Sequence, residues 1–196
     1  MTNNNDQHYI NQTINGDAHA FSVLVNRYKD LVFTLALRML KNKEEAEEVS
    51  QDTFIKTYQA LHKFKGHSKF SAWIYKVTYN TCLDRLKKNK KHYNDVAIDE
   101  ITENQIKTMD NALDKMEEKE YNKLIQDCLT LLPKDDAFLL TLYYFETYSL
   151  EEISKIVGIT ANNVKVKIFR SRKKLATILK HRLEPEIIEY YERERK

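Results

Sequence analysis

Residues 149–179, SLEEISKIVGITANNVKVKIFRSRKKLATIL, contain the pattern that decides the fold of this chain. Ser149 followed by Glu152 is a capping box, in which the two residues satisfy each other's backbone N–H groups at the start of a helix. Gly158 comes where that helix must end, because glycine adopts the left-handed conformation of a helix terminus at little cost. Thr160 can cap a second helix. The stretch therefore predicts a helix-turn-helix.

The second of these helices is predicted to be apolar on one side and basic on the other. Val164, Ile168, Leu175 and Leu179 fall on one stripe, so this side should pack against the first helix. In helix-turn-helix proteins the second helix enters the major groove of DNA, where Lys, Arg and Asn contact base edges or phosphates. The residues of these types expected to face DNA are Asn163, Lys165, Lys167, Arg170, Lys173 and Lys174.

The composition favours helices throughout the chain. Its 196 residues include only three glycines and two prolines, whereas sheet proteins use many of both in their turns. Cys82 and Cys128 are far apart and the histidines lack metal-ligand spacing, so we expect two buried thiols, no disulfide, no metal and no cofactor. Residues 1–16 show no signal sequence, and the longest uncharged apolar run, 137–145, is too short to span a bilayer. These features predict an all-α cytoplasmic protein without membrane insertion.

Two basic blocks alternate with acidic segments, although the net charge of the whole chain is only +3. Residues 61–92 contain nine lysines and arginines against one acidic residue, and residues 153–182 contain nine against none. Basic surfaces neutralise phosphates and release counterions, which drives binding to nucleic acids. A single charged helix face can simply be solvated, but two such blocks favour a nucleic-acid-binding protein.

The charge and hydrophobic patterns divide the chain into two small helical domains. Apolar residues spaced by three and four predict one long helix or two shorter ones over residues 17–40, with further helices over 43–61 and 70–90. Pro133 separates two helices of the second domain. Residues 93–115 are acidic and weakly periodic, which is typical of a flexible linker. We therefore expect a polar N-terminal tail (1–16), a first domain (17–92), a linker (93–115), a helix-turn-helix domain (116–182) and a charged C-terminal tail (183–196).

The basic block of the first domain is also rich in aromatic residues. Aromatic rings stack on unpaired bases while lysines and arginines follow the backbone, which is the chemistry of single-stranded nucleic-acid binding. Stacking contributes about 1–3 kcal/mol per base. Extruding a base costs a few kcal/mol, so one or two stacked bases can offset local opening of a duplex. Trp73 and Tyr79 could instead belong to the hydrophobic core. The aromatic residues are Phe64, Phe70, Trp73, Tyr75, Tyr79 and, just beyond the block, Tyr93.

The helix before this block, NKEEAEEVSQDTFIKTY (residues 42–58), is acidic in its first half. Asn42 can cap this helix, and acidic side chains near an N-terminus stabilise the helix dipole. The same carboxylates could also bind a basic surface of another protein. The pattern leaves both interpretations open.

Long segments of the chain resemble one known family. The segments AFSVLVNRYKDLVFTLALRML (20–40), EEAEEVSQDTFIKTYQAL (44–61) and FKGHSKFSAWIYKVTYNTCLDRLKK (64–88) resemble the conserved-core domain of extracytoplasmic-function (ECF) sigma factors of bacterial RNA polymerase. Residues 132–175 look like the carboxy-terminal promoter-binding domain of that family. Because both segments occur in family order with a linker between them, the resemblance is specific and covers most of the chain.

The resemblance implies roles for individual residues. On the acidic helix, Glu47, Glu48, Gln51 and Asp52 match the surface that binds the clamp helices of core RNA polymerase. The loop and the helix after it match the region that captures a flipped base and recognises the −10 element, through Phe64, Lys65, His67, Ser68, Lys69, Trp73, Lys76 and Asn80. The helix that recognises the −35 element is matched by Asn163, Lys165, Lys167, Phe169, Arg170, Arg172 and Lys173. Val166 stands where the family often has a small polar residue, a departure that leaves the preferred −35 sequence open.

The sequence therefore predicts a sigma factor that binds core RNA polymerase and promoter DNA and starts transcription at a specific set of genes. The pattern contains no phosphate-binding loop and no spacing typical of catalytic residues, so we expect no enzymatic activity. The resemblance also implies an anti-sigma factor as a regulatory partner. Two other interpretations remain open. A stand-alone helix-turn-helix regulator would leave the acidic helix and the aromatic block unexplained, and a helical adaptor would use its charged faces only to bind proteins.

Overall fold

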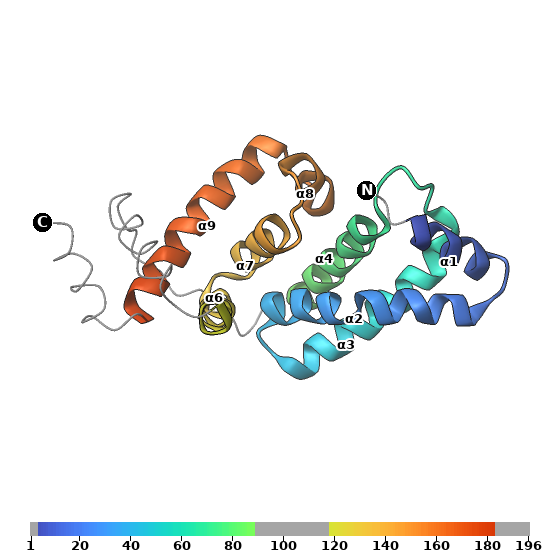
Figure 1. The fold of residues 1–196 in the computed structure, drawn as a ribbon, viewed down its shortest axis with the longest axis horizontal. Helices are drawn as coiled ribbons and strands as arrows, with labels where there is room; N and C mark the ends of the chain where they lie inside the picture. Colours follow the sequence, from blue (N-terminus) through green and yellow to red (C-terminus); the bar gives the residue numbers. More distant parts are fainter. Residues whose placement is uncertain (1–3, 89–117, 183–196) are drawn as a thin grey trace, which may run out of the picture.

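The computed structural model describes residues 4–88 and 118–182, and every regular element within these two ranges is helical (Figure 1). The predicted linker and the predicted C-terminal tail lie outside the described residues. The first range contains α1 (Asn4–Ile14), α2 (Ala18–Leu40), α3 (Lys43–Ala60), the short η1 (Leu61–Lys63) and α4 (Phe70–Lys88). The second range contains α6 (Glu118–Leu131), α7 (Lys134–Leu140), η2 (Thr141–Phe145), α8 (Leu150–Val157) and α9 (Ala161–Arg182).

Capping residues set the boundaries of the first helices. The Asp17 side chain accepts hydrogen bonds from the backbone N–H groups of His19 and Ala20 and starts α2, which runs as a single helix where the periodicity also allowed two. α2 ends at Lys41 in the left-handed conformation. Asn42 then accepts a hydrogen bond of 2.8 Å from the N–H of Glu45 and starts α3, which confirms the predicted cap.

Part of the predicted polar tail is a packed helix. Residues 4–14 form α1, which lies against α2, with Ile10 only 1% exposed. The Asp6 carboxylate is buried as well, and it forms an ion pair with Arg27 and accepts a hydrogen bond of 2.6 Å from the hydroxyl of Tyr28. Sequence alone missed α1 because its one strongly buried apolar residue stands in a run of polar residues.

The helix-turn-helix forms as predicted. The hydroxyl of Ser149 accepts a hydrogen bond from the N–H of Glu152 at 3.2 Å, and Glu152 Oε2 accepts one from the N–H of Ser149 at 3.0 Å. Gly158 ends α8 with a φ of +75°, in the left-handed region. The hydroxyl of Thr160 accepts a hydrogen bond from the N–H of Asn163 in the first turn of α9.

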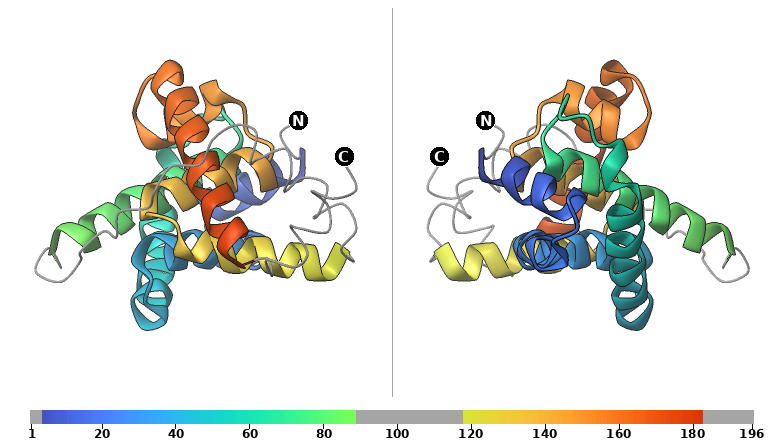
Figure 2. Two further views of the ribbon diagram at one scale, coloured as in Figure 1. Left: turned by 90° about the vertical axis from the view of Figure 1, so that its left-hand side faces the viewer. Right: turned by 90° about the vertical axis from the view of Figure 1, so that its right-hand side faces the viewer.

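The two groups of helices pack against each other through α4 and α2 (Figure 1). α4 contacts α8, and the rings of Tyr75 and Tyr148 lie 5.9 Å apart at that contact. The ring of Tyr79 lies 4.9 Å from that of Phe138 in α7. Beyond this contact the carboxyl-terminal end of α4 projects past the other helices (Figure 2). The buried apolar residues of both groups consequently form one continuous core.

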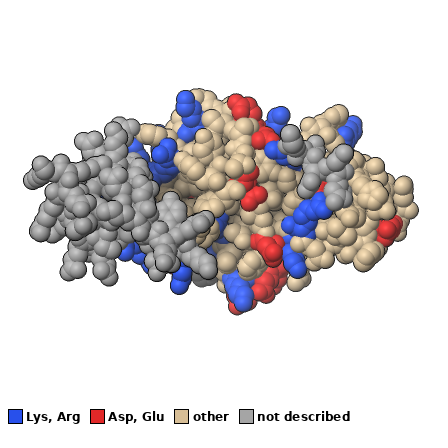
Figure 3. Space-filling model, viewed as in Figure 1, with Lys and Arg blue, Asp and Glu red and all other residues tan. Residues whose placement is uncertain are grey.

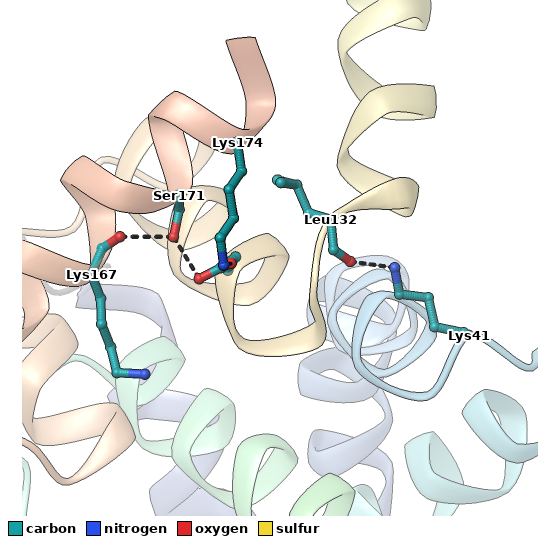
Figure 4. Close-up of polar contacts among 6 residues, drawn as sticks. Lys41, Leu132, Lys167, Ser171 and Lys174 are labelled. Atoms are coloured by element: carbon teal, nitrogen blue, oxygen red, sulfur yellow. Dashed lines mark hydrogen bonds and ion pairs between the residues drawn. The ribbon is translucent and has the colours of Figure 1, made fainter. Parts of the chain in front are cut away.

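Two basic residues at the end of α2 add polar contacts to this interface. Arg38 is only 5% exposed, and its guanidinium donates hydrogen bonds to the side chains of Thr141 and Gln126. Burial lowers the pKa of Arg38 to about 10, so the group stays charged at neutral pH. The ammonium of Lys41 donates hydrogen bonds to the carbonyl oxygens of Thr130 and Leu132 near the end of α6, and Figure 4 shows the bond to Leu132. These contacts satisfy carbonyl groups that a helix end leaves without partners.

Cys82 and Cys128 are both buried and unpaired, as predicted. Burial raises the pKa of the Cys82 thiol to about 12. Within the two described ranges, none of the helices has the length and apolar character needed to cross a bilayer.

Replacing Arg38 with alanine should lower the free energy of unfolding by about 2–3 kcal/mol, because hydrogen bonds from a buried charged group are worth that much. Urea denaturation followed by circular dichroism measures the change. Lys29→Ala, an exposed position on the same helix, should change stability by less than about 0.5 kcal/mol. An Arg38→Ala variant as stable as the Lys29→Ala control would mean that the polar contacts across the interface contribute nothing.

Candidate nucleic-acid interface

A buried polar cluster holds α9 against α7. Asp136 is 8% exposed and accepts a hydrogen bond of 2.7 Å from the hydroxyl of Ser171, which is fully buried. The ammonium of Lys174 lies 2.7 Å from the other carboxylate oxygen of Asp136 (Figure 4). Lys174, which the helical spacing assigns to the outer face, therefore holds the domain together instead. Val164 and Ile168 are buried on the same side of α9, as predicted.

The opposite side of α9 presents the predicted DNA contacts to solvent. Lys173 is half-buried, and its ammonium lies 5.0 Å from the centre of the Phe169 ring. This cation–π contact keeps a positive charge beside an exposed aromatic ring. The remaining predicted contacts are exposed, and they are Asn163, Lys165, Lys167, Phe169, Arg170 and Arg172.

The loop before α4 starts with a packed aromatic side chain and has a solvent-exposed tip. Phe64 is half-buried, with its ring 5.6 Å from that of Phe70 and 5.4 Å from that of Trp73. The loop turns at Gly66, whose φ of +72° is in the left-handed region that favours glycine. The predicted contacts at the tip, Lys65, His67 and Ser68, are exposed.

The two sides of α4 have different surroundings. Trp73 is half-buried, and Lys76 and Asn80 are exposed three and seven residues further on, which places all three on one side of the helix. Tyr75 and Tyr79 belong to the other side, against α8 and α7. Trp73 is therefore only partly buried in the core. Tyr79 packs at the interface between the two groups of helices.

Lys69 connects the loop to the helix-turn-helix. Its ammonium lies 3.0 Å from Glu152 Oε1 and 5.2 Å from the centre of the Tyr148 ring. The backbone N–H of Ser149 and the ammonium of Lys69 hold the pKa of the Glu152 carboxyl below its usual value. Next to this pair, the hydroxyls of Ser71 and Tyr148 are hydrogen-bonded. One residue predicted to contact the −10 element is thus occupied by the second domain in this conformation.

The acidic helix α3 presents a charged outer side. Glu47, Glu48, Gln51 and Asp52 are all exposed, while Ala46 and Val49 are buried. Glu48 Oε2 lies 2.8 Å from the guanidinium of Arg85 in α4, and Glu47 Oε1 lies 3.9 Å from the ammonium of Lys43, so two of the four predicted contacts already have a basic partner within the chain. Figure 3 shows acidic and basic side chains beside one another on one face of the molecule rather than a continuous surface of one sign.

Sequence reasoning missed the residues that join the two domains. Arg38, Lys41 and Glu146 make contacts across the interface, and burial raises the pKa of Glu146 while Tyr75 and Arg38 act in the opposite direction. No local pattern could identify these pairs, because their members are between 71 and 108 residues apart in the chain. Among the described residues no group of three or more His, Cys, Asp or Glu side chains is arranged to hold a metal ion.

Comparison with known families matches both halves of this fold. The Sigma-70 region 2 family matches residues 24–92, and the Sigma-70, region 4 family matches residues 122–175. The first match covers α2 from residue 24 onward, α3 and α4, and the second covers the helix-turn-helix up to the middle of α9. The fold is therefore that of a sigma-70-type transcription initiation factor.

Relatives of similar length show to which family of sigma factors the chain belongs. The chain is 34% identical to the ECF RNA polymerase sigma factor SigW of Bacillus subtilis, over 85% of this chain and 92% of the relative. It is 31% identical to the ECF RNA polymerase sigma-E factor of Escherichia coli K12, over 85% and 90%. The chain belongs to the ECF family of sigma factors, and it acts with RNA polymerase in promoter recognition.

Solved structures share the fold at low sequence identity. The sigma factor RpoE in complex with the anti-sigma factor NepR, from Bartonella quintana, has a TM-score of 0.60 and 18% identity, over 82% of this chain and 96% of that one. CnrH in complex with the cytosolic domain of CnrY has a TM-score of 0.57 and 20% identity, over 91% and 99%.

Replacing Asp136 with alanine should lower the free energy of unfolding by about 1.5–3 kcal/mol, because it removes the carboxylate that pairs with the Lys174 ammonium and leaves the buried Ser171 hydroxyl only its hydrogen bond to the Lys167 carbonyl. Thermal and urea denaturation of the full chain measure the loss. Glu151→Ala removes an exposed carboxylate from α8 and serves as the control, with an expected change below about 0.5 kcal/mol. Equal stability of the two variants would contradict a structural role for the Asp136 cluster.

Proposed function

We propose that this sigma factor divides promoter recognition between its two domains. The outer side of α9 binds the −35 element as a duplex, and the loop at residues 64–69 together with α4 binds and opens the −10 element. The observation that supports this division best is the two-sidedness of α9, since Val164 and Ser171 are buried while Lys165, Arg170 and Arg172 remain exposed. A helix with one packed side and one basic exposed side fits the major groove.

Opening of the −10 element would rely on stacking and not on an energy source. Phe64 and Trp73 present half-buried rings next to the exposed loop tip, with Lys65 and Lys76 near enough in sequence to follow the phosphate backbone. Each stacked base contributes about 1–3 kcal/mol, which is comparable with the cost of extruding a base. The proposed −10 contacts are Phe64, Lys65, His67, Ser68, Lys69, Trp73, Lys76 and Asn80.

The acidic outer side of α3 is the proposed docking surface for core RNA polymerase. All four proposed contact residues are exposed, so a partner could bind them without disturbing the packed side of the helix. They are Glu47, Glu48, Gln51 and Asp52. Charged residues at such a surface mainly steer association and fix its geometry. Arg85 would have to share or release Glu48 when a basic partner surface arrives.

The two domains must separate before both promoter elements can be bound at once. The −35 and −10 elements lie about 25 base pairs apart, which is roughly 85 Å along B-form DNA. In the conformation described above, which we call closed, α4 contacts α8 and α8 contacts α9. The two proposed DNA-binding helices, α4 and α9, are therefore separated only by α8. Layers of packed helices are about 8–10 Å apart. Separation would also release Lys69 from Glu152.

The chain is proposed to act without enzymatic activity of its own, in the cytoplasm, where bacterial RNA polymerase works. A protein of the anti-sigma class is the proposed regulator. This partner is suggested by the structural relatives RpoE and CnrH, which are described in complexes with NepR and CnrY.

Run-off transcription with core RNA polymerase and a pool of genomic promoter fragments tests the proposed function. Defined transcripts should appear only when this protein is added, and their start sites should identify both promoter elements. Absence of transcripts together with absence of binding to core polymerase would reject the proposal. Tight sequence-specific DNA binding by the protein alone would then favour a stand-alone helix-turn-helix regulator.

The double variant Glu48→Gln/Asp52→Asn should bind core polymerase roughly tenfold more weakly, because each exposed charge pair contributes up to about 1 kcal/mol. The measurement is titration of fluorescently labelled protein with core polymerase at two salt concentrations. A variant with the same change of charge elsewhere, Asp30→Asn/Glu151→Gln, should bind like the unmodified protein. Equal weakening of the two double variants would indicate an effect of net charge and not a docking surface on α3.

A further inference from the structure

The middle of the outermost ridge of α9 is apolar, although the helix is basic. Successive residues of an α-helix are 100° apart, so the residues directly opposite the buried Val164, Ile168 and Ser171 are Asn162, Val166, Phe169 and Lys173, with the two polar ones at the ends. Val166 is 42% exposed and Phe169 is 49% exposed on this ridge. Neither side chain is needed to hold α9 in place, because the packing is made by the opposite side of the helix.

Basic side chains flank the ridge on both sides. Lys165 and Arg172 lie to one side of it, Arg170 lies to the other, and all three are exposed. The phosphate chains form the walls of the major groove, and the base edges form its floor. A helix that places cations toward both walls therefore directs its central ridge toward the base edges. The Lys173 ammonium, 5.0 Å from the Phe169 ring centre, adds a cation on the ridge itself.

The apolar pair Val166 and Phe169 at the middle of the ridge can recognise only one feature of the major-groove floor. Donors and acceptors of the bases need polar partners, which valine and phenylalanine lack. The C5 methyl group of thymine is the one apolar group that the natural bases present there. Val166 and Phe169 are three residues apart, about 4.5 Å along the helix axis. That spacing is close to one base-pair step of about 3.4 Å.

We propose that Val166 and Phe169 recognise the C5 methyl groups of thymines at two neighbouring base pairs of the −35 element. The inference rests on the proposed role of α9 in binding that element, and it identifies the bases that Val166 and Phe169 prefer there. The thymines can belong to either strand, since both strands present their methyl groups in the major groove.

Deoxyuridine provides the test, because it pairs like thymine and keeps the O4 acceptor but lacks the methyl group. Once the promoter is mapped, synthetic templates replace each thymine of the −35 duplex singly with deoxyuridine. Run-off transcription by the complete holoenzyme is then measured at subsaturating enzyme. Two adjacent base pairs should each lose about fourfold in activity, which corresponds to about 0.8 kcal/mol for one buried methyl-sized group.

Variants assign each methyl group to a side chain. Val166→Ala should remove the sensitivity to deoxyuridine at one of the two base pairs, and Phe169→Ala should remove it at the other. Ile14→Ala truncates a similarly exposed apolar side chain on α1, 48% exposed, and should keep the full sensitivity at both. Thermal unfolding of all three variants should match that of the unmodified protein, because the truncated side chains are exposed.

The outcomes separate this inference from the proposed function. Normal transcription that is indifferent to deoxyuridine throughout the −35 element would overturn the inference and leave the function intact. Unchanged sensitivity in Val166→Ala and Phe169→Ala would also overturn it, since other residues would then contact the methyl groups. A holoenzyme that transcribes none of the thymine templates would instead reject the proposed function.

Discussion

The burial of one side of α4 against the helix-turn-helix domain is the contact on which the described conformation depends. Tyr75 meets Tyr148 of the second domain, and Tyr79 meets Phe138. Large aromatic side chains supply most of the apolar area at such contacts, and paired rings add about 0.5–1.5 kcal/mol beyond their area. Because this side of α4 is buried, its other side, with Trp73, is the one available for the proposed contact with the −10 element. The same contact brings Glu152 to Lys69 and Arg38 to Thr141.

Each proposed binding helix follows the same division between a packed side and a charged or polar side. α3 buries Val49 and exposes Glu48, and α9 buries Ser171 and exposes Arg170. The division lets a small chain hold its core together while three separate surfaces stay available for polymerase and for two DNA elements. The loop at Lys69 is the exception, because that side chain is engaged by the second domain. Because this lysine is a proposed DNA contact, polymerase or DNA can compete with its internal ion pair.

Local signals in the sequence predicted much of this structure. The capping box at Ser149, the turn at Gly158 and the cap at Asn42 all formed as expected, because each depends on residues only a few positions apart. α1 escaped prediction because its burial rests on Ile10 and on the contacts of Asp6 with α2, both in a polar stretch. The pairing of Arg38 with Thr141 was also unpredictable, since residues so far apart leave no periodic signature.

The candidate site was predictable to a similar degree. Helical periodicity placed Arg170 and Lys165 correctly on the exposed side of α9, but it misplaced Lys174. A lysine at the border of a helix face can reach inward when a buried carboxylate such as Asp136 is close, and only the three-dimensional packing reveals that carboxylate. Sequence also gave no indication that Lys69 and Glu152 would meet.

The central claim is that the two domains are closed in the free protein and separate on the promoter. Spin labels at Lys29→Cys in α2 and Lys155→Cys in α8, both exposed positions, report this distance by pulsed electron resonance once Cys82 and Cys128 are replaced with serine. The free protein should give a narrow distribution below about 40 Å, the diameter of a compact domain of this size. Core polymerase with promoter DNA should lengthen the distance by tens of ångströms. The same distribution in both states, or a long distance in the free protein, would contradict the account.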